Sequence, residues 1–132
     1  MFRWKILSLI ILSLILLTPA CTRQSAQGDQ ASNLTVDLSF EPETPVMGEG
    51  IILLKIWDEQ TQPIEDLSIE VKGDMTHAGM TPVFGTSSYQ GDGIYRVPFK
   101  WTMAGDWILQ VTAELPDGRI LDRSFDVRVA SE

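Results

Sequence analysis

One short segment of the sequence concentrates side chains that can bind a soft metal ion. Two methionines, Met75 and Met80, flank the only histidine of the chain, His77. Thioether sulfur and imidazole nitrogen are ligands that monovalent copper selects, whereas calcium and magnesium require oxygen. In an extended segment, Met75 and His77 project to one face about 6 to 7 Å apart. Gly79 lets the chain turn so that Met80 can return toward them, and the spacing therefore permits a shared Cu(I) site.

The same segment is also compatible with ordinary packing. Methionine is a flexible side chain that fills gaps in hydrophobic cores. A loop that folds over the open end of a β-sandwich can bury Met75 and Met80 while His77 only forms a hydrogen bond. The residues alone leave both interpretations open.

The rest of the sequence contains little of the chemistry that enzymes use. It has one histidine and one cysteine, and it lacks a serine nucleophile elbow, a phosphate-binding glycine loop and the Cys/His spacing of zinc sites. Its 18 acidic and 10 basic side chains give a formal net charge of −8. This charge disfavours nucleic acid and anionic lipid headgroups as partners. We therefore expect a binding protein that is not an enzyme and does not bind nucleic acid.

The N-terminus has the pattern of an export signal. Arg3 and Lys5 precede an apolar run of Leu, Ile and Ser at residues 6–17, which is shorter than the roughly 20 residues of a membrane-spanning helix. The junction before Cys21 resembles the lipobox of bacterial lipoproteins, in which the cysteine carries the lipid; an uncleaved anchor and an incidental thiol are the alternatives. We predict a signal peptide over residues 1–20, a lipid anchor on Cys21 and an extracytoplasmic domain held at the cell membrane.

Beyond the cysteine, the chain is predicted to form a tether and a single domain. Residues 22–32 are polar or small and lack the apolar content that would order them, so residues 21–33 are expected to be the lipidated cysteine and a flexible tether. The domain then covers residues 34–130. This length permits one hydrophobic core and leaves no room for a second domain.

The domain has the periodicity of β-strands. From Leu34 onward, apolar residues recur with a period of two, and turn-rich segments separate the apolar runs about every 8 to 12 residues. No segment has helical periodicity. The fold class is therefore predicted to be all-β, a seven-stranded immunoglobulin-like β-sandwich without a disulfide, since the chain has a single cysteine. The expected strands are residues 34–40, 51–57, 67–71, 82–89, 95–101, 107–113 and 121–129.

Individual residues in these strands lead to further expectations. Pro98 cannot donate a backbone hydrogen bond, which predicts that its strand lies at a sheet edge or contains a bulge. Arg123 is the one charged residue on the apolar face of the last expected strand. Large aromatic residues on alternating strand positions usually pack in the core. On this basis the core is predicted to contain Trp57, Tyr95, Trp101 and Trp107.

The order of the strands predicts where the methionines meet. Successive strands of an antiparallel sandwich reverse direction, so the connections alternate between its two ends. With seven strands, the first, third and fifth connections share one end. They contain Met47, residues 75–80 and Met103, respectively. Every methionine after the signal, together with the only histidine, is therefore expected at the end away from the tether.

The sequence also resembles a known family. The resemblance is carried by the loop that contains Met75 and His77, by Gly93-Ile94-Tyr95, and by the run Met-Ala-Gly-Asp-Trp at residues 103–107. This pattern is similar to the YtkA-like domain, a relative of FixH-type domains. The resemblance implies a small exported or membrane-anchored immunoglobulin-like sandwich, associated with copper handling and with cytochrome oxidase assembly.

Two hypotheses follow for the function. The resemblance implies a membrane-anchored Cu(I) carrier or accessory factor that supplies copper to an acceptor cuproprotein such as an oxidase subunit. The alternative is an interaction module without metal, an accessory subunit that docks on a membrane complex. In the first hypothesis Met47 is a nearby spare thioether. The copper ligands are then Met75, His77, Met80 and Met103.

Overall fold

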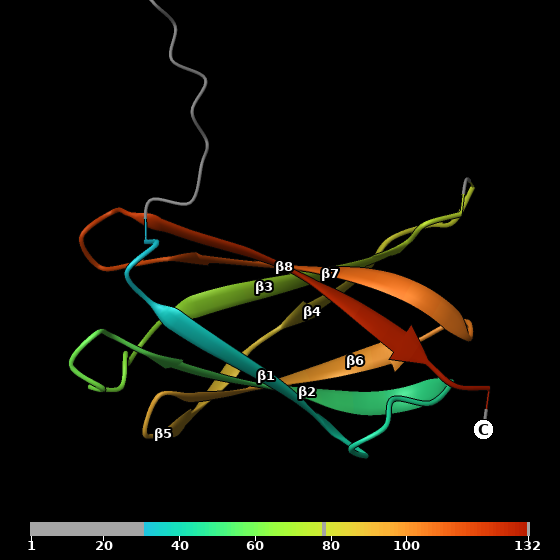
Figure 1. Cartoon of the computed structure of the whole chain (residues 1–132), viewed down its shortest axis with the longest axis horizontal. Coiled ribbons are helices and arrows are strands. Elements are labelled where there is room, and N and C mark those ends of the chain that lie inside the picture. The colour runs from blue at the N-terminus through green and yellow to red at the C-terminus, as the bar shows by residue number, and fades with distance from the viewer. Residues whose placement is uncertain (1–30, 78, 132) are drawn as a thin grey trace, which may run out of the picture.

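The computed structural model describes residues 31–77 and 79–131 (Figure 1). The predicted signal peptide, the lipid anchor on Cys21 and most of the predicted tether lie outside these residues. Within them, the chain forms eight β-strands. Their bounds are β1 Thr35–Glu41, β2 Gly48–Trp57, β3 Ser68–Met75, β4 Val83–Thr86, β5 Ser88–Gly91, β6 Ile94–Trp101, β7 Gly105–Glu114 and β8 Ile120–Val129.

The strands form two antiparallel sheets that pack face to face (Figure 1). One sheet has the strand order β1-β2-β6-β5 and the other has the order β4-β3-β7-β8. This is the arrangement of an immunoglobulin-like sandwich, whose strands A, B, E and D correspond to β1, β2, β6 and β5, and whose strands C, F and G correspond to β3, β7 and β8. The predicted all-β sandwich is confirmed, and the number of strands is eight instead of seven. Among the described residues, no helix is long and apolar enough to cross a membrane.

The extra strand arises because the expected strand at residues 82–89 is divided between the two sheets. β4 pairs with β3, whereas β5 pairs with β6. The chain changes sheets at Ser87, whose backbone N–H donates to the carbonyl of Ile69 at 3.0 Å. More and less exposed residues alternate without a break from Val83 to Gly91. The sequence pattern is therefore that of a single strand. The chain keeps its direction when it changes sheets, so the alternation of the connections between the two ends is also unchanged.

The position of Pro98 differs from the expectation of a simple edge strand. β6 lies between β2 and β5, but β5 pairs only with Ile94, Tyr95 and Arg96. Pro98 pairs with Ile51 of β2 and lies beyond the end of β5. The proline therefore occupies a part of an interior strand where one neighbour has already ended.

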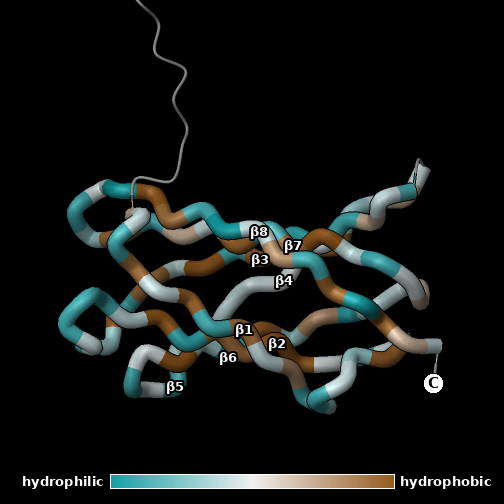
Figure 2. Tube along the Cα trace, in the orientation of Figure 1, coloured by the Kyte–Doolittle hydropathy of each residue, from teal (hydrophilic) through white to brown (hydrophobic). Residues whose placement is uncertain are grey.

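Hydrophobic residues concentrate along the strands (Figure 2) and fill the space between the sheets. Tyr95, Trp101 and Trp107 are buried, as predicted. The assignment of Trp57 to the core is wrong, because Ile56 points inward and its neighbour therefore points outward. Trp57 is half-buried on the outer surface, and the Nζ atom of Lys55 lies 5.6 Å from the centre of its ring.

Tyr95 fastens the connection between β2 and β3 from inside the core. Its hydroxyl donates to the carbonyl of Ile64 at 2.7 Å and accepts the backbone N–H of Leu67 at 3.2 Å. A buried tyrosine that bonds to backbone groups of a neighbouring connection holds that connection against the sheet. The residue thus contributes hydrogen bonds as well as buried ring area.

Hydrogen bonds to the backbone explain why Arg123 lies on the apolar face of β8. Its guanidinium group is partly buried and donates to the carbonyl of Ala31 at 3.2 Å and to the carbonyl of Leu34 at 3.0 Å. Ala31 itself is fully buried. In addition, Arg119 donates to the Asn33 side chain at 3.0 Å. The last residues of the predicted tether, 31–33, are therefore attached to the β7–β8 hairpin.

The sandwich has two ends with different connections. We call the end with the β1–β2, β3–β4 and β6–β7 connections the methionine pole, and the end with residues 31–34 and the β2–β3, β5–β6 and β7–β8 connections the N-terminal pole. The register fixes this division, since Gly48 pairs with Trp101 at one end and Thr35 pairs with Trp57 at the other.

Candidate functional site

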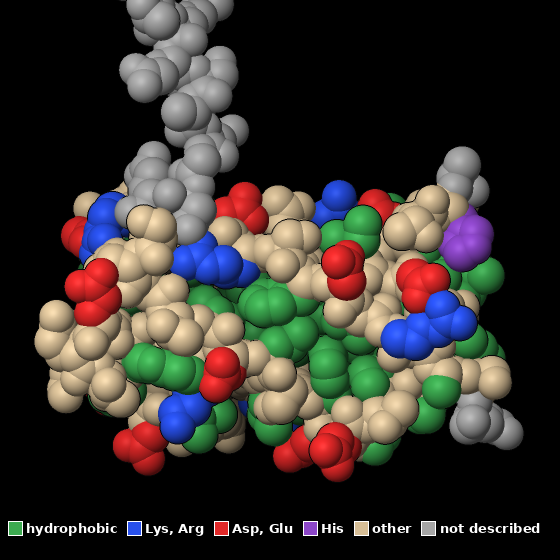
Figure 3. All heavy atoms as spheres, viewed as in Figure 1, with side chains coloured by type: hydrophobic (Ala, Val, Ile, Leu, Met, Phe, Trp, Pro, Cys, Tyr) green, Lys and Arg blue, Asp and Glu red, His purple; other side chains and the backbone are tan. Residues whose placement is uncertain are grey.

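The structure places all of the candidate ligands at the methionine pole. Met75 ends β3 and pairs with Trp107 near the start of β7. Met103 lies between β6 and β7, and Met47 directly precedes β2. The histidine, coloured purple in Figure 3, follows the end of β3 and lies at one end of the sandwich. The alternation of the connections thus gives the expected arrangement, with the methionines and the histidine on one side of the core.

Met75 lies next to Gly105, the first residue of β7, which follows the connection that carries Met103. The Met75 side chain is 6% exposed and packs with the core. Its terminal methyl carbon, Cε, lies only 2.9 Å from where a β-carbon on Gly105 would be. Gly105 has a φ of 129°, a conformation that side-chain-bearing residues rarely adopt. The missing side chain at Gly105 therefore makes room for the Met75 thioether beside the β6–β7 connection.

Met103 combines an exposed side chain with a fixed backbone. The residue is 51% exposed. Its carbonyl oxygen accepts a hydrogen bond from the indole Nε1 of Trp107 at 3.0 Å. Trp107 is 1% exposed and is the strand partner of Met75. One buried indole thus joins the backbone of Met103 to the strand next to Met75.

The other candidate side chains differ in their exposure. His77 is exposed, and Met80 is partly buried and packs against the hydrophobic core. Met47 is 51% exposed, and its backbone N–H donates to the carbonyl of Ala130 at 3.0 Å. A partner that approaches this pole therefore meets His77, Met103 and Met47 before it meets Met75.

A cluster of aromatic rings lies beneath the methionine pole. The Trp101 and Trp107 rings are 5.3 Å apart at 88°, and Phe99 lies 4.8 Å from Trp101 and 6.2 Å from Trp107. Phe40 completes the group at 6.0 Å from Trp101. Edge-to-face contacts of this kind hold the rings in defined orientations. The sequence analysis assigned Trp101 and Trp107 to the core but did not connect them to the site.

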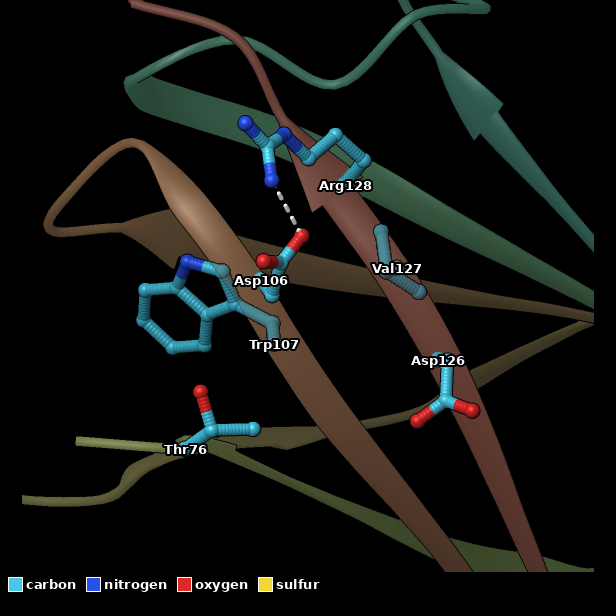
Figure 4. Close-up of a pocket in the computed structure, with 6 residues that line it drawn as sticks. All are labelled: Thr76, Asp106, Trp107, Asp126, Val127 and Arg128. Atoms are coloured by element: carbon cyan, nitrogen blue, oxygen red, sulfur yellow. Dashed lines mark hydrogen bonds and ion pairs between the residues drawn. The ribbon is translucent and has the colours of Figure 1, made fainter.

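A shallow pocket lies at the methionine pole, where β7 begins and β8 ends (Figure 4). It has a volume of about 320 Å³. Within it, Arg128 donates to Asp106 in an exposed ion pair of 2.6 Å. Sequence reasoning missed these charged residues, because each lies on an outward strand position typical of a solvated surface. The pocket is lined by Thr76, Asp106, Trp107, Asp126, Val127 and Arg128.

The candidate ligands at this pole are three thioethers and one imidazole, at Met75, Met80, Met103 and His77. In the part of the chain that the structure describes, no three His, Cys, Asp or Glu side chains gather as a metal site. Thioether and imidazole donors match Cu(I) and match hard ions poorly, so the residue types fit the ion that the sequence suggested.

The fold and the site together define an immunoglobulin-like sandwich with a methionine-bearing pole. The YtkA-like family model matches residues 28–112, more than half of the chain. The protein therefore belongs to the YtkA-like family. The match includes Met75, His77, Met80, Met103 and Trp107.

The solved structures that are similar to the chain include PmoD and CRIg. The soluble domain of PmoD from Methylocystis sp. aligns with a TM-score of 0.47 and 14% identity, over 74% of this chain and 90% of that one. Murine CRIg aligns with a TM-score of 0.43 and 14% identity, over 74% of this chain and 98% of that one. No curated protein matches the sequence.

Proposed function

We propose that the protein is an extracytoplasmic copper-binding protein that carries Cu(I) or assists the metalation of an envelope cuproprotein. The observation that supports this most directly is the contact between the Met75 methyl group and Gly105, two residues after Met103. Two segments that are distant in sequence thus bring thioethers toward one pole. Thioether and imidazole side chains are the donors expected for Cu(I) outside the cytoplasm, where a thiol would be liable to oxidation.

Four residues would hold the ion. Met75 and Met80 provide thioethers from the edge of the core, and Met103 and His77 provide donors that solvent reaches. Bound copper would supply no reaction here, since the ion is cargo. The exposed donors allow the ligands of an acceptor to replace them one at a time, while Met75 remains attached to its strand. We accordingly propose a carrier and not an enzyme.

A chelator titration tests this proposal. The chain from residue 22 onward includes every described residue and lacks the only cysteine, so that any Cu(I) it retains anaerobically against a competing chelator is bound without thiol. We expect one equivalent to be retained. Met103→Leu should lower the affinity by about tenfold, the effect of removing roughly 1.4 kcal/mol of binding free energy. Met47→Leu is the matched control, because Met47 is equally exposed but lies outside the proposed ligand set.

The membrane attachment is a separate part of the proposal. We propose that Cys21 carries the lipid that holds the domain at the bacterial membrane, where an acceptor such as an oxidase subunit would receive the copper. Cys21→Ala should release the domain from the membrane, or leave an uncleaved precursor, without unfolding it. Intact mass and detergent partitioning measure this. Absence of a lipid mass increment in the wild-type protein would contradict it.

One observation favours the alternative, a docking module without metal. Met75 is almost fully buried and Met80 packs against the core, as expected for methionines that only fill space. In that case Met47 and Met103 would form an apolar contact surface. The chelator titration separates the two functions, because a docking module would release all Cu(I) to the chelator, and Met103→Leu would leave its metal content unchanged.

A further inference from the structure

We propose that Trp107 is a positioning residue of the copper site, and this inference rests on the proposed function. The residue itself supplies no metal ligand. Its indole N–H donates to the carbonyl of Met103 at 3.0 Å, and its ring lies in the core with 1% exposure. It is therefore the one group in the described part of the chain that ties the backbone of the exposed Met103 to the buried core through a side-chain hydrogen bond.

The surroundings of the Trp107 ring fix the direction of that hydrogen bond. Trp101 and Phe99 contact it edge to face, at interplanar angles of 88° and 80°. A ring held on two sides cannot rotate away without disturbing both contacts. The indole N–H consequently remains directed toward the connection between β6 and β7.

Trp107 is also linked to both of the methionines that the site must bring together, Met75 and Met103. Its backbone pairs with that of Met75, and Figure 4 shows its indole beside Thr76, the residue that follows Met75. On the other side, Gly105 receives the Met75 methyl group. Loss of the indole N–H would leave the Met103 carbonyl without this partner and would free the connection to move relative to Met75.

Trp101 provides a matched comparison in the same aromatic cluster. It is 2% exposed, and its ring contacts both Trp107 and Phe99. Its Nε1 atom faces Gly50, since a β-carbon there would lie 3.0 Å away. Among the described residues, the Trp101 indole makes no hydrogen bond to the β6–β7 connection. Replacement of either tryptophan by phenylalanine therefore removes similar packing, but only one replacement removes the bond to Met103.

The experiment compares Trp107→Phe with Trp101→Phe in the chain from residue 22 onward. We expect Trp107→Phe to increase backbone hydrogen exchange at residues 102–105 and to lower the Cu(I) affinity, each by about tenfold, as the loss of one hydrogen bond implies. Trp101→Phe should change neither by more than about twofold. If Trp107→Phe fails to fold, a benzothiophene analogue of tryptophan at position 107 keeps the ring shape and removes only the donor.

The outcomes separate this inference from the proposed function. If the wild-type chain retains no Cu(I), the proposed function is overturned, and the role of Trp107 at a copper site with it. If the wild type binds Cu(I) and the two variants bind it equally well, only the positioning role is overturned. The same conclusion holds if Trp107→Phe loosens residues 102–105 while the affinity stays at the wild-type value, because Trp107 would then be purely structural.

Discussion

The two poles of the sandwich use their side chains differently. At the N-terminal pole, side chains bond to the backbone of the connections: Asp58 accepts the N–H groups of Gln60 and Gln62, and the hydroxyl of Tyr95 bonds to two backbone groups of the β2–β3 connection. At the methionine pole, the connections present sulfur and an imidazole instead. Among the described residues, fewer side chains there form hydrogen bonds to the backbone. The most buried side chain that donates such a hydrogen bond is the indole of Trp107.

This difference indicates that the two poles of one small domain have different roles. At the N-terminal pole, side chains form hydrogen bonds to the backbone of the connections and so stabilise them. The described residues of the methionine pole include thioether donors, which are the ligand type that suits a soft ion. The following substitutions test that difference.

The largest expected effect comes from removing the ring beneath the methionine pole. Trp107→Ala should destabilise the domain by about 3 to 5 kcal/mol, because it truncates a large buried aromatic side chain. Chemical denaturation measures the change. Trp57→Ala is the control, since this half-buried tryptophan on the outer surface should cost much less. If both substitutions lowered the unfolding free energy equally, the ring of Trp107 would contribute no more to stability than a half-buried ring on the outer surface.

At the N-terminal pole, Tyr95→Phe should cost about 1 to 3 kcal/mol, because it leaves the Ile64 carbonyl and the Leu67 N–H without their buried partner. Hydrogen exchange should increase in the β2–β3 connection and remain unchanged at residues 102–105. An equal increase in hydrogen exchange at both poles would contradict the view that the connections of the two poles are stabilised independently.

Tyr95 also predicts a dependence on alkaline pH. Burial raises the pKa of Tyr95 above its ordinary value, and the hydrogen bond with the Leu67 N–H only partly opposes this. Because the folded-state pKa is higher than the unfolded one, the stabilisation is complete below about pH 10 and is lost as the pH rises through the folded-state value. Tyr95→Phe should therefore show a weaker alkaline decline in unfolding free energy. Part of the decline should persist, since burial raises the pKa of Tyr89 too.

A smaller effect should separate backbone strain from the methionine contact. Gly105→Ala and Gly118→Ala both place a β-carbon at a positive φ, which costs roughly 1 to 2 kcal/mol. Only the first places that carbon against the Met75 methyl group. We expect Gly105→Ala to be the more destabilising and the only one of the pair to lower Cu(I) affinity. Equal affinities would show that the Met75 contact is irrelevant to the ion.

The smallest change in stability is expected at His77. His77→Ala removes an exposed side chain and should alter the unfolding free energy by less than about 0.5 kcal/mol. Its effect should be confined to Cu(I) affinity, measured by the same chelator titration. Thr76→Ala, at the exposed neighbouring position, is the control and should leave both quantities unchanged.

Most of the fold follows from a period of two in the sequence. The same parity that buries Ile69 and Val71 also buries Met75, so the inward direction of this methionine could be predicted by extending the alternation of β3. The outward direction of Trp57 was equally readable, since it has the parity of the charged Lys55. Assigning Trp57 to the core gave its size more weight than its position.

Other features could not be predicted, because they depend on contacts between distant backbone groups. The division of residues 82–89 between two sheets leaves the alternation intact, so periodicity has no signal for it. The hydrogen bond from Trp107 to Met103 requires the geometry of a closed connection. For the site, the sequence predicted which pole carries the methionines and the histidine. It could not predict that Met103, which lies in a connection outside the alternation of any strand, remains exposed.

The attachment of residues 31–34 to the β7–β8 hairpin determines how far the methionine pole can reach. β7 has 10 residues and spans the length of the sandwich, which corresponds to about 30 Å at the usual rise of a strand. Arg123 and Arg119 hold the start of the domain at the opposite end, so the sandwich acts as a stiff spacer. A domain tethered upright at its N-terminal side would hold its thioethers about 30 Å beyond residue 31. If the domain is held at a membrane as proposed, an acceptor that projects from the bilayer would meet the thioethers of an upright sandwich. An acceptor level with the bilayer would meet them when the sandwich lies on its side.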